Sequence, residues 1–144
     1  MKKFFPLFVL IFLVLTSFNY NSADSILGVW ANGTNKGHIQ LYKQDGKYYG
    51  KIIWLKQPND ETGKPKIDKN NPDENERSKR LLGLIMLRDF KYEDGEWTDG
   101  KIYNPDDGKE YKSKMKLKDA KTLAVRGYIG ISLLGKTENF VRIR

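Results

Sequence analysis

The chain has 144 residues and no cysteine, with 26 lysines and arginines against 18 aspartates and glutamates. The lack of cysteine excludes disulfides, thiol catalysis and cysteine-ligated zinc. The net charge of +8 would suit an acidic partner, but acidic residues are interleaved with the basic ones along the chain. The charge pattern by itself therefore predicts a well-solvated surface.

The first 23 residues have the pattern of a signal peptide. Lys2 and Lys3 precede an apolar run from Phe4 to Leu15, and a polar stretch then leads to Ala23, a small residue that suits cleavage. An apolar run of about a dozen residues is short for a membrane span, which needs roughly 20. We predict an exported protein, periplasmic or secreted, with residues 1–23 as signal peptide and 24–144 as one domain. A retained membrane anchor is the alternative; after signal removal we expect no stable span.

The rest of the chain alternates polar and apolar residues with a period of two, as strands do. Asp45-Gly46 between two such runs is a hairpin signal. The run 81–87 is apolar on both parities, which predicts a strand buried on both faces. Eight strands joined mostly by short turns favour an up-and-down barrel, because closure removes exposed edges. The predicted strands are 26–30, 37–43, 48–55, 81–87, 97–103, 111–118, 123–129 and 136–143.

One long polar excursion, residues 57–80, interrupts the strands, and loops of this length are usually functional or disordered. It carries oxygen-bearing side chains that would suit calcium, namely Asp60, Asp68, Asn70 and Asp73. Their spacing does not match a calcium-binding EF-hand loop, and lysines at 64, 66 and 69 oppose a cation. We therefore expect turn and capping roles for these residues and predict no metal.

Gly28-x-Trp30 near the start and Arg142 near the end resemble the lipocalin signature, in which the arginine packs across the tryptophan and closes the barrel. The mature chain also resembles an uncharacterised family of exported bacterial proteins with a lipocalin-like barrel. Phe140 departs from that family, where tryptophan is expected. The blocks that carry the resemblance are Tyr49-Gly50-Lys51-Ile52, Asp60-x-x-Gly63-x-Pro65-x-x-Asp68, Asn71-Pro72-Asp73 with Arg77, Arg80-x-Leu82-Gly83, Gly100-Lys101-Ile102-Tyr103-x-Pro105-x-x-Gly108-Lys109-x-Tyr111 and Arg126-Gly127-Tyr128-Ile129-Gly130 to Thr137.

The resemblance implies an all-β fold, namely a single eight-stranded antiparallel up-and-down barrel with one long loop between its third and fourth strands. In such a barrel Gly28, Trp30 and Arg142 have the structural role of closure. The resemblance implies no reaction, because a fold does not by itself determine a function.

The residues give little support to an enzyme. His38 is the only histidine and lies on an alternating strand, and Ser132 misses the spacing of a nucleophile elbow by one residue. The lysines at 112, 114, 116 and 118 form one strand face that contains no aromatic residue, whereas proteins that bind single-stranded nucleic acid interleave the two. We predict no catalytic residues, no cofactor and no nucleic acid partner.

The barrel interior is the remaining candidate site. Apolar and phenolic side chains there could bind a small hydrophobic, lipid-like or amphipathic molecule, while the alternative is that they fill the barrel and leave no room. Arg126 is expected at the rim or under the long loop, holding an anionic headgroup or pairing with a loop aspartate. The predicted ligand-binding residues are Tyr48, Ile52, Trp54, Met86, Tyr103, Tyr111, Met115 and Arg126.

We thus predict an exported, lipocalin-like binder of a small ligand in the cell envelope. The alternative is a non-enzymatic envelope protein that docks a protein or a glycan through the 57–80 loop and its basic surface. The sequence gives no indication of the oligomeric state.

Overall fold

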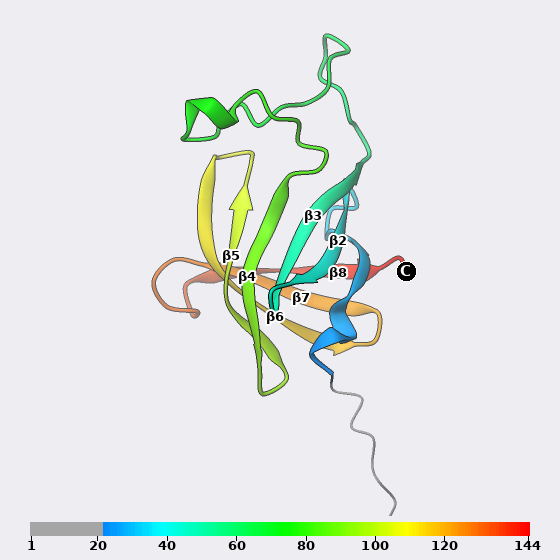
Figure 1. Ribbon diagram of the computed structural model, residues 1–144, viewed down its shortest axis with the longest axis vertical. Helices are drawn as coiled ribbons and strands as arrows, with labels where there is room; N and C mark the ends of the chain where they lie inside the picture. The colour runs from blue at the N-terminus through cyan, green and yellow to red at the C-terminus, as the bar shows by residue number, and fades with distance from the viewer. Residues whose placement is uncertain (1–21) are drawn as a thin grey trace, which may run out of the picture.

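The computed structural model describes residues 22–144, which form a closed antiparallel barrel of eight strands (Figure 1). Each strand pairs with the next one in sequence, and β8 returns to pair with β1. This confirms the predicted fold class. The strands are β1 Gly28–Ala31, β2 Gly37–Gln44, β3 Lys47–Leu55, β4 Ile85–Glu93, β5 Glu96–Asn104, β6 Lys109–Asp119, β7 Thr122–Tyr128 and β8 Gly135–Arg142, with 3-10 helices η1 Ala23–Ile26 and η2 Glu74–Glu76.

The predicted cleavage site lies inside the folded part of the chain, whereas residues 1–21 of the predicted signal peptide lie outside the described residues. Ala23 begins η1, and its carbonyl oxygen accepts a hydrogen bond of 3.0 Å from the indole of Trp97. Asp24 accepts a bond of 2.6 Å from the hydroxyl of Tyr48. Cleavage between residues 23 and 24 would cut through η1. The position of the cleavage site remains a prediction. Within residues 22–144, no helix has the length and apolar character needed to cross a membrane.

The barrel closes where the two ends of the chain meet. Trp30 on β1 is paired with Arg142 on β8, and the guanidinium carbon lies 4.2 Å from the indole centroid. The same guanidinium donates hydrogen bonds to the carbonyl oxygens of Ser25 (2.6 Å), Ala120 (2.9 Å) and Leu27 (3.1 Å). Because one cation binds the N-terminal segment, the β6–β7 turn and the indole face, it joins three parts of the barrel base. The closure predicted from the signature is confirmed.

Large aromatic side chains fill the barrel interior. Tyr48, Phe90 and Trp97 are each at most 2% exposed, as are Trp30 and Phe140. Gly100 leaves the space that Phe90 occupies, because a Cβ at Gly100 would lie 2.3 Å from the phenyl Cδ1. Small barrels of eight strands have just enough volume to be filled in this way. Neither of the two cavities described below lies among these side chains.

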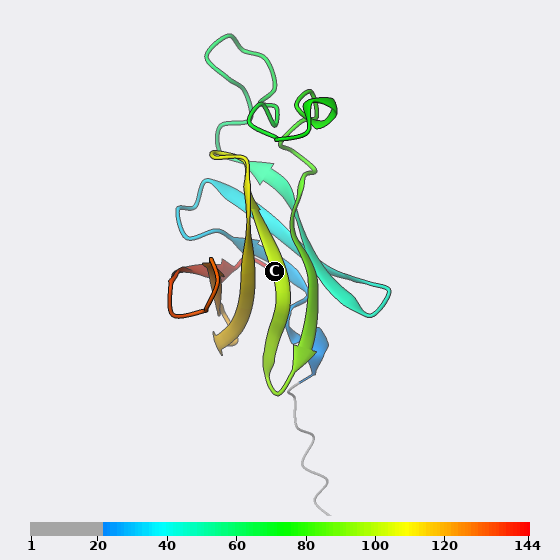
Figure 2. The ribbon, with the colours of Figure 1, turned by 90° about the vertical axis from the view of Figure 1, so that its left-hand side faces the viewer.

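The long connection between β3 and β4 covers residues 56–84 and stands beyond one end of the barrel, next to the β5–β6 hairpin (Figure 2). The predicted strand over 81–87, buried on both faces, is wrong: residues 81–84 belong to this loop and β4 begins at Ile85. Leu82 is 49% exposed and Ile85 is 47% exposed. The first part of this apolar run instead forms the base of the loop. There the backbone amide of Gly83 donates a 2.7 Å hydrogen bond to the carbonyl oxygen of Ile52.

Two bulges interrupt neighbouring strands. Tyr48 and Gly50 on β3 pair with Phe90 and Leu87 on β4, so two residues of β4, Arg88 and Asp89, lie opposite the single residue Tyr49 of β3. The extra residue is accommodated by Asp89, which has a φ of 62°. β5 has the same arrangement against β6, with Asp99 at a φ of 55°. Bulges of this kind change which residues face inward, a change that strict alternation in a sequence cannot reveal.

Candidate functional site

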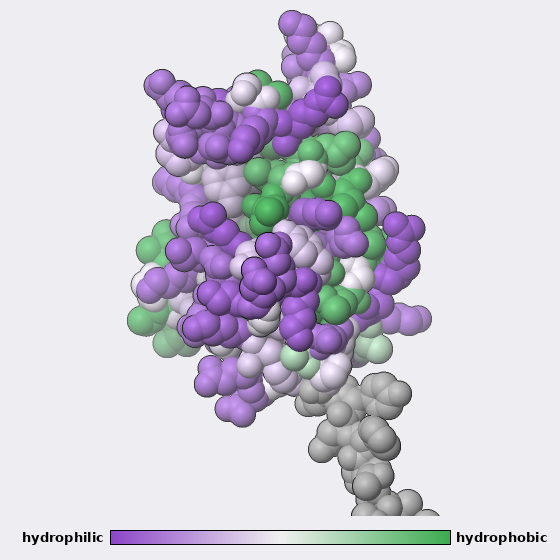
Figure 3. Space-filling view, in the orientation of Figure 1, coloured by the Kyte–Doolittle hydropathy of each residue, from purple (hydrophilic) through white to green (hydrophobic). Residues whose placement is uncertain are grey.

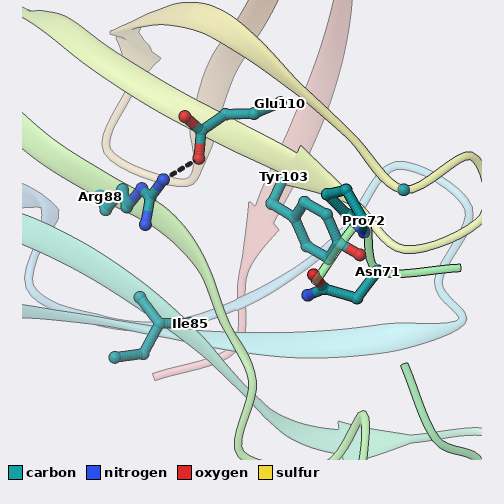
Figure 4. A pocket seen from close by; sticks show the side chains of 7 residues that line it. Asn71, Pro72, Ile85, Arg88, Tyr103 and Glu110 are labelled. Carbon is teal, nitrogen blue, oxygen red and sulfur yellow. Dashed lines mark hydrogen bonds and ion pairs between the residues drawn. The ribbon is translucent and has the colours of Figure 1, made fainter. Parts of the chain in front are cut away.

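The larger of the two cavities lies between the long loop and the barrel wall and has a volume of about 290 Å³. It is lined by Asn71, Pro72, Ile85, Arg88, Tyr103, Gly108 and Glu110. The lining residues come from the loop, from β4, β5 and β6, and from the turn between β5 and β6. Figure 4 shows the ring of Tyr103 beside Pro72 and Asn71, with Ile85 across the cavity.

The strand register puts this cavity on the outer wall of the barrel. Leu87 is fully buried and pairs with Ile102, so that row of residues faces inward. Arg88 is paired with Lys101 in the next row, which therefore faces outward. Tyr103 and Glu110 are also paired, one position beyond the inward Ile102. The cavity consequently has the outer faces of three strands as its floor and the loop as its cover.

A buried carboxylate attaches the loop to this wall. Asp68 is 1% exposed; one of its oxygens accepts a 2.7 Å bond from the hydroxyl of Tyr103, and the other accepts a 2.7 Å bond from the amide of Asn71. Burial, together with the bond to Asp68, raises the pKa of Tyr103 to about 12. The phenol therefore stays protonated at neutral pH and remains a donor to the loop.

A second set of contacts fixes the loop against the β5–β6 turn. The amide of Asn70 donates to the carbonyl oxygens of Pro105 (3.1 Å) and Asp106 (3.0 Å). Arg77, just after η2, donates a 2.6 Å bond to the carbonyl of Asn71. These residues include much of the family-like pattern in the sequence, and in the structure they hold the cover over the cavity.

The cavity has one charged side and one apolar side. The guanidinium of Arg88 forms an ion pair and hydrogen bond with Glu110, and the ammonium of Lys101 lies 3.7 Å from the other oxygen of that carboxylate. Two cations thus share the carboxylate of Glu110 on this side of the cavity, while the carboxylate of Asp68 is already bonded to Tyr103 and Asn71. Ile85 and Pro72 supply apolar surface opposite. Figure 3 shows apolar side chains gathered over the upper parts of β3 and β4, just below the loop.

The eight residues predicted to bind a ligand do not line one cavity. Tyr48, Ile52 and Met115 belong to the packed core, at 1%, 5% and 1% exposure, and Met86 packs partly buried against it. Of the eight, Tyr103 alone lines the larger cavity. The filling role that the sequence left as the alternative therefore describes Tyr48, Ile52 and Met115 in this structure.

Trp54 corrects the prediction that it faces inward. It is 42% exposed, and its ring lies 4.3 Å from that of His38. The cause is a register shift: Ile39 pairs with Ile52, but the next residue back, His38, pairs with Trp54. The extra residue on β3, Ile53, moves Trp54 to the outer face. His38 is therefore an outer-face partner of an indole.

Tyr111 and Arg126 are occupied by local contacts. The hydroxyl of Tyr111 donates a 2.5 Å bond to Asp107 in the β5–β6 turn, and this bond lowers the pKa of the Asp107 carboxyl. Arg126 donates a 2.7 Å bond to the carbonyl of Ser132 and a 2.8 Å bond to Thr137, so it supports the β7–β8 loop and not the long loop. Arg126 and Met115 both border the second cavity, of about 130 Å³, on the outer side of β6 and β7.

Of the four residues considered for calcium, Asp60 and Asp73 have the turn and capping roles that were expected, whereas Asp68 and Asn70 attach the loop to Tyr103 and to the β5–β6 turn. Asp60 accepts hydrogen bonds from the backbone and hydroxyl of Thr62 and from the backbone of Lys64, and the hydroxyl bond is the main cause of its lowered pKa. Asp73 caps η2 by accepting from Asn75. Within residues 22–144, no group of three or more acidic or histidine side chains has a geometry that could hold a metal ion.

The sequence did not single out Arg88, Glu110 or Ile85. Arg88 and Glu110 lie on neighbours of the same central strand, β5, so they can meet only once the pairing of β4, β5 and β6 is known. The signal that was present is the Asn71-Pro72-Asp73 block and the turn from Tyr103 to Gly108. Both blocks were noted as family-like, and both border the cavity.

Comparisons with known proteins agree with this fold. The chain belongs to the family described as an uncharacterized protein conserved in bacteria (DUF2147), whose model matches residues 28–142. A solved structure, that of protein HP1028 from the human pathogen Helicobacter pylori, which is described as belonging to the lipocalin family, is similar to it. The two share 23% sequence identity, with a TM-score of 0.72 over 82% of each chain. A comparison with curated proteins gave no match.

Proposed function

We propose that this member of the DUF2147 family binds a small, anionic, amphipathic molecule in the cavity between the long loop and the outer wall of β4, β5 and β6. The observation that carries the proposal is the cavity itself, with a volume of about 290 Å³. An apolar protein cavity of about 150 Å³ accommodates a benzene ring. The space under the loop therefore suits a molecule of roughly twice that size.

The chemistry of the lining supports an anionic group on the ligand. Glu110 is shared by Arg88 and Lys101, and a guanidinium has five N–H donors, so Arg88 can keep Glu110 and still bind a carboxylate. Ile85 and Pro72 offer contact to an alkyl chain or a ring. A few polar groups combined with apolar walls are typical of small-molecule sites.

The loop supports the proposal because its cover is already formed. Asp68 and Asn70 attach it to Tyr103 and to the β5–β6 turn without any ligand. A ligand would then not have to order the loop, which lowers the entropic cost of binding. We further propose that the protein acts in the cell envelope, as the basic and apolar pattern of the first residues suggests. Cell fractionation with an antibody to the protein tests that location.

The binding experiment is an amide NMR titration of residues 22–144 with octanoate, and with 1-octanol as the neutral analogue. We expect octanoate to shift the amides near Arg88, Tyr103 and Gly108, with a Kd on the order of 1 mM. We expect Arg88→Gln to weaken octanoate binding about tenfold, since a charge-assisted bond is lost. We expect Glu110→Gln to strengthen it, because a competing carboxylate is removed.

The matched control is Lys91→Gln. Lys91 is an exposed cation on β4, the strand of Arg88, and it does not line the cavity. This change should leave octanoate binding unaltered. Shifts confined to Ile52 and Met115 would mean that the ligand enters the barrel, contrary to the proposal. Equal affinity for octanoate and octanol would contradict the role of Arg88.

A second candidate function is docking of a protein or a glycan through the long loop. The observation that favours it is the exposure of Ile67 (43%) and Leu82 (49%) on a loop that hydrogen bonds hold in place. The double variant Ile67→Ser/Leu82→Ser removes these two exposed side chains. If the candidate is right, a partner crosslinked to the loop in envelope extracts is lost in this variant while the melting temperature of the barrel is unchanged.

A further inference from the structure

The loop between β7 and β8 exposes an unusual amount of apolar surface. Four of its six residues are large and apolar, with exposed fractions of 69% for Ile129, 61% for Ile131, 82% for Leu133 and 70% for Leu134. Figure 3 shows apolar spheres at the left margin of the molecule, where Figure 1 places this loop. None of these residues borders the cavity under the long loop.

Hydrogen bonds within the protein occupy four carbonyl oxygens and two amides of the loop backbone. The carbonyl oxygens of Ser132 and Leu133 accept bonds of 2.7 Å and 3.4 Å from the guanidinium of Arg126. The amide of Leu134 donates to Ile131, and the amide of Ile129 donates to Leu134. Backbone groups that are already paired are a requirement for entering an apolar medium, because an unpaired group there costs free energy.

Basic side chains surround the apolar tip. Lys112 and Lys114 on β6 are paired in register with Tyr128 and Arg126 on β7, and Lys136 follows the tip at the start of β8. No ion pair within residues 22–144 includes any of these three lysines. A tip of exposed leucine and isoleucine with unpaired cations behind it is complementary to an apolar layer beneath an anionic surface.

We propose that the β7–β8 loop docks the protein onto the surface of a bilayer that contains anionic lipids. Leu133, Leu134 and Ile131 enter the boundary between headgroups and acyl chains. Lys112, Lys114 and Lys136 remain at the level of the phosphates. Arg126 is a positioning residue, because it holds the loop backbone in the shape that presents the tip. The proposal uses no residue of the ligand cavity and does not depend on it.

The test is co-sedimentation of residues 22–144 with vesicles of phosphatidylcholine alone and of phosphatidylcholine with phosphatidylglycerol. We expect binding to the mixed vesicles and much weaker binding to the neutral ones. The double variant Leu133→Ser/Leu134→Ser should lower the partition coefficient by at least about tenfold. The double variant Lys112→Gln/Lys136→Gln should lower it on mixed vesicles only, and salt should have the same effect.

Two control variants match these changes. Val141→Ser removes an apolar side chain that is 51% exposed on β8, outside the loop, and Lys91→Gln removes a cation from β4. Both should bind vesicles as the parent protein does. A tryptophan introduced by Leu133→Trp should shift its emission to the blue with mixed vesicles, whereas one introduced by Val141→Trp should not.

The outcomes separate the proposal from its rivals. Failure of the parent protein to bind mixed vesicles would overturn it, and so would equal binding of the Leu133→Ser/Leu134→Ser variant. If sedimentation velocity instead shows a dimer that this variant abolishes, the tip is a contact between two copies of the chain. Melting temperatures of all variants should stay close to that of the parent, because the replaced side chains are exposed.

Discussion

Gly108 and the carbonyl oxygen of Asn70 are in such close contact that no side chain fits between them. A Cβ on Gly108 would lie 1.9 Å from that oxygen, and the φ of Gly108 is 68°, a conformation that favours glycine. Because glycine has no Cβ, the backbone of the long loop can pack directly against the β5–β6 turn at Gly108. This close contact adds to the hydrogen bonds that hold the cover of the cavity in place.

Replacing Gly108 by alanine should displace the loop from the turn. Gly63→Ala is the matched control, since Gly63 has a φ of 81° but nothing within 4 Å of its Cβ position. The control should cost only the backbone strain, about 1–2 kcal/mol. Gly108→Ala should cost more and should also increase hydrogen exchange in residues 66–72. Equal urea midpoints for the two variants would contradict the close contact.

Removing the hydroxyl of Tyr103 should loosen the cover without opening the barrel. Tyr103→Phe leaves one oxygen of the buried Asp68 without its donor, which should cost about 1–3 kcal/mol. Hydrogen exchange should rise in the long loop and stay unchanged in β1 and β8. Tyr128→Phe is the control, because no hydrogen bond of that hydroxyl holds the loop.

The same tyrosine predicts a pH dependence at the alkaline end. Its pKa is raised to about 12 in the folded protein, whereas an unfolded tyrosine has a pKa of about 10. A raised folded-state pKa gives stability that is fully present below pH 10 and is lost as the pH rises toward 12. Between these pH values the urea midpoint of the parent should approach that of Tyr103→Phe. A constant difference from pH 8 to pH 12 would contradict this assignment.

Replacing Arg142 should destabilise the whole barrel. Arg142→Lys keeps the charge but cannot make the three directed bonds to Ser25, Leu27 and Ala120, and we expect a loss of at least about 2 kcal/mol in the free energy of unfolding. Arg144→Lys is the control, because Arg144 contacts β1 through its backbone oxygen, which accepts a hydrogen bond from the amide of Val29. Urea unfolding followed by tryptophan fluorescence measures both variants.

The residue at which the mature chain begins should affect stability. A protein that starts at Asp24 lacks the carbonyl of Ala23, and the indole N–H of Trp97, a residue only 2% exposed, then loses its acceptor. We expect it to be less stable than a protein that starts at Ala23, by about 1–3 kcal/mol. Mass spectrometry of the protein isolated from cells identifies the natural start. Equal stability of the two forms would show that solvent replaces the acceptor.

The barrel could be predicted from the sequence because its strands alternate cleanly and its hairpins have strong turn signals. The turn at Asp45-Gly46 joins β2 to β3 as predicted, and the lysine row of β6 lies outside the barrel. The signature pair of Trp30 and Arg142 forms the predicted contact. The strand alternation and the turn signals are local in the sequence, and the closure rests on the one residue pair Trp30 and Arg142, so all of them can be read without knowing the fold.

The candidate site could not be predicted, for two physical reasons. The bulge at Ile53 changes which residues of β3 face inward, so Trp54 was expected inside and lies outside. The bulge at Asp89 makes the same kind of change on β4. The cavity depends on pairing across three strands and on a loop that folds back over them, and neither has a periodic signal. Arg88 and Glu110 in particular are 22 residues apart and become neighbours only in the folded sheet.

The seam between β1 and β8 is the pairing that closes the barrel. Every other pair of neighbouring strands is consecutive in sequence, although the 56–84 loop separates β3 from β4. The seam brings together residues up to 117 positions apart in the sequence. Until β8 pairs with β1, the sheet has two open edges. Once β8 pairs with β1, the sheet has no free edge left that could pair with another protein chain.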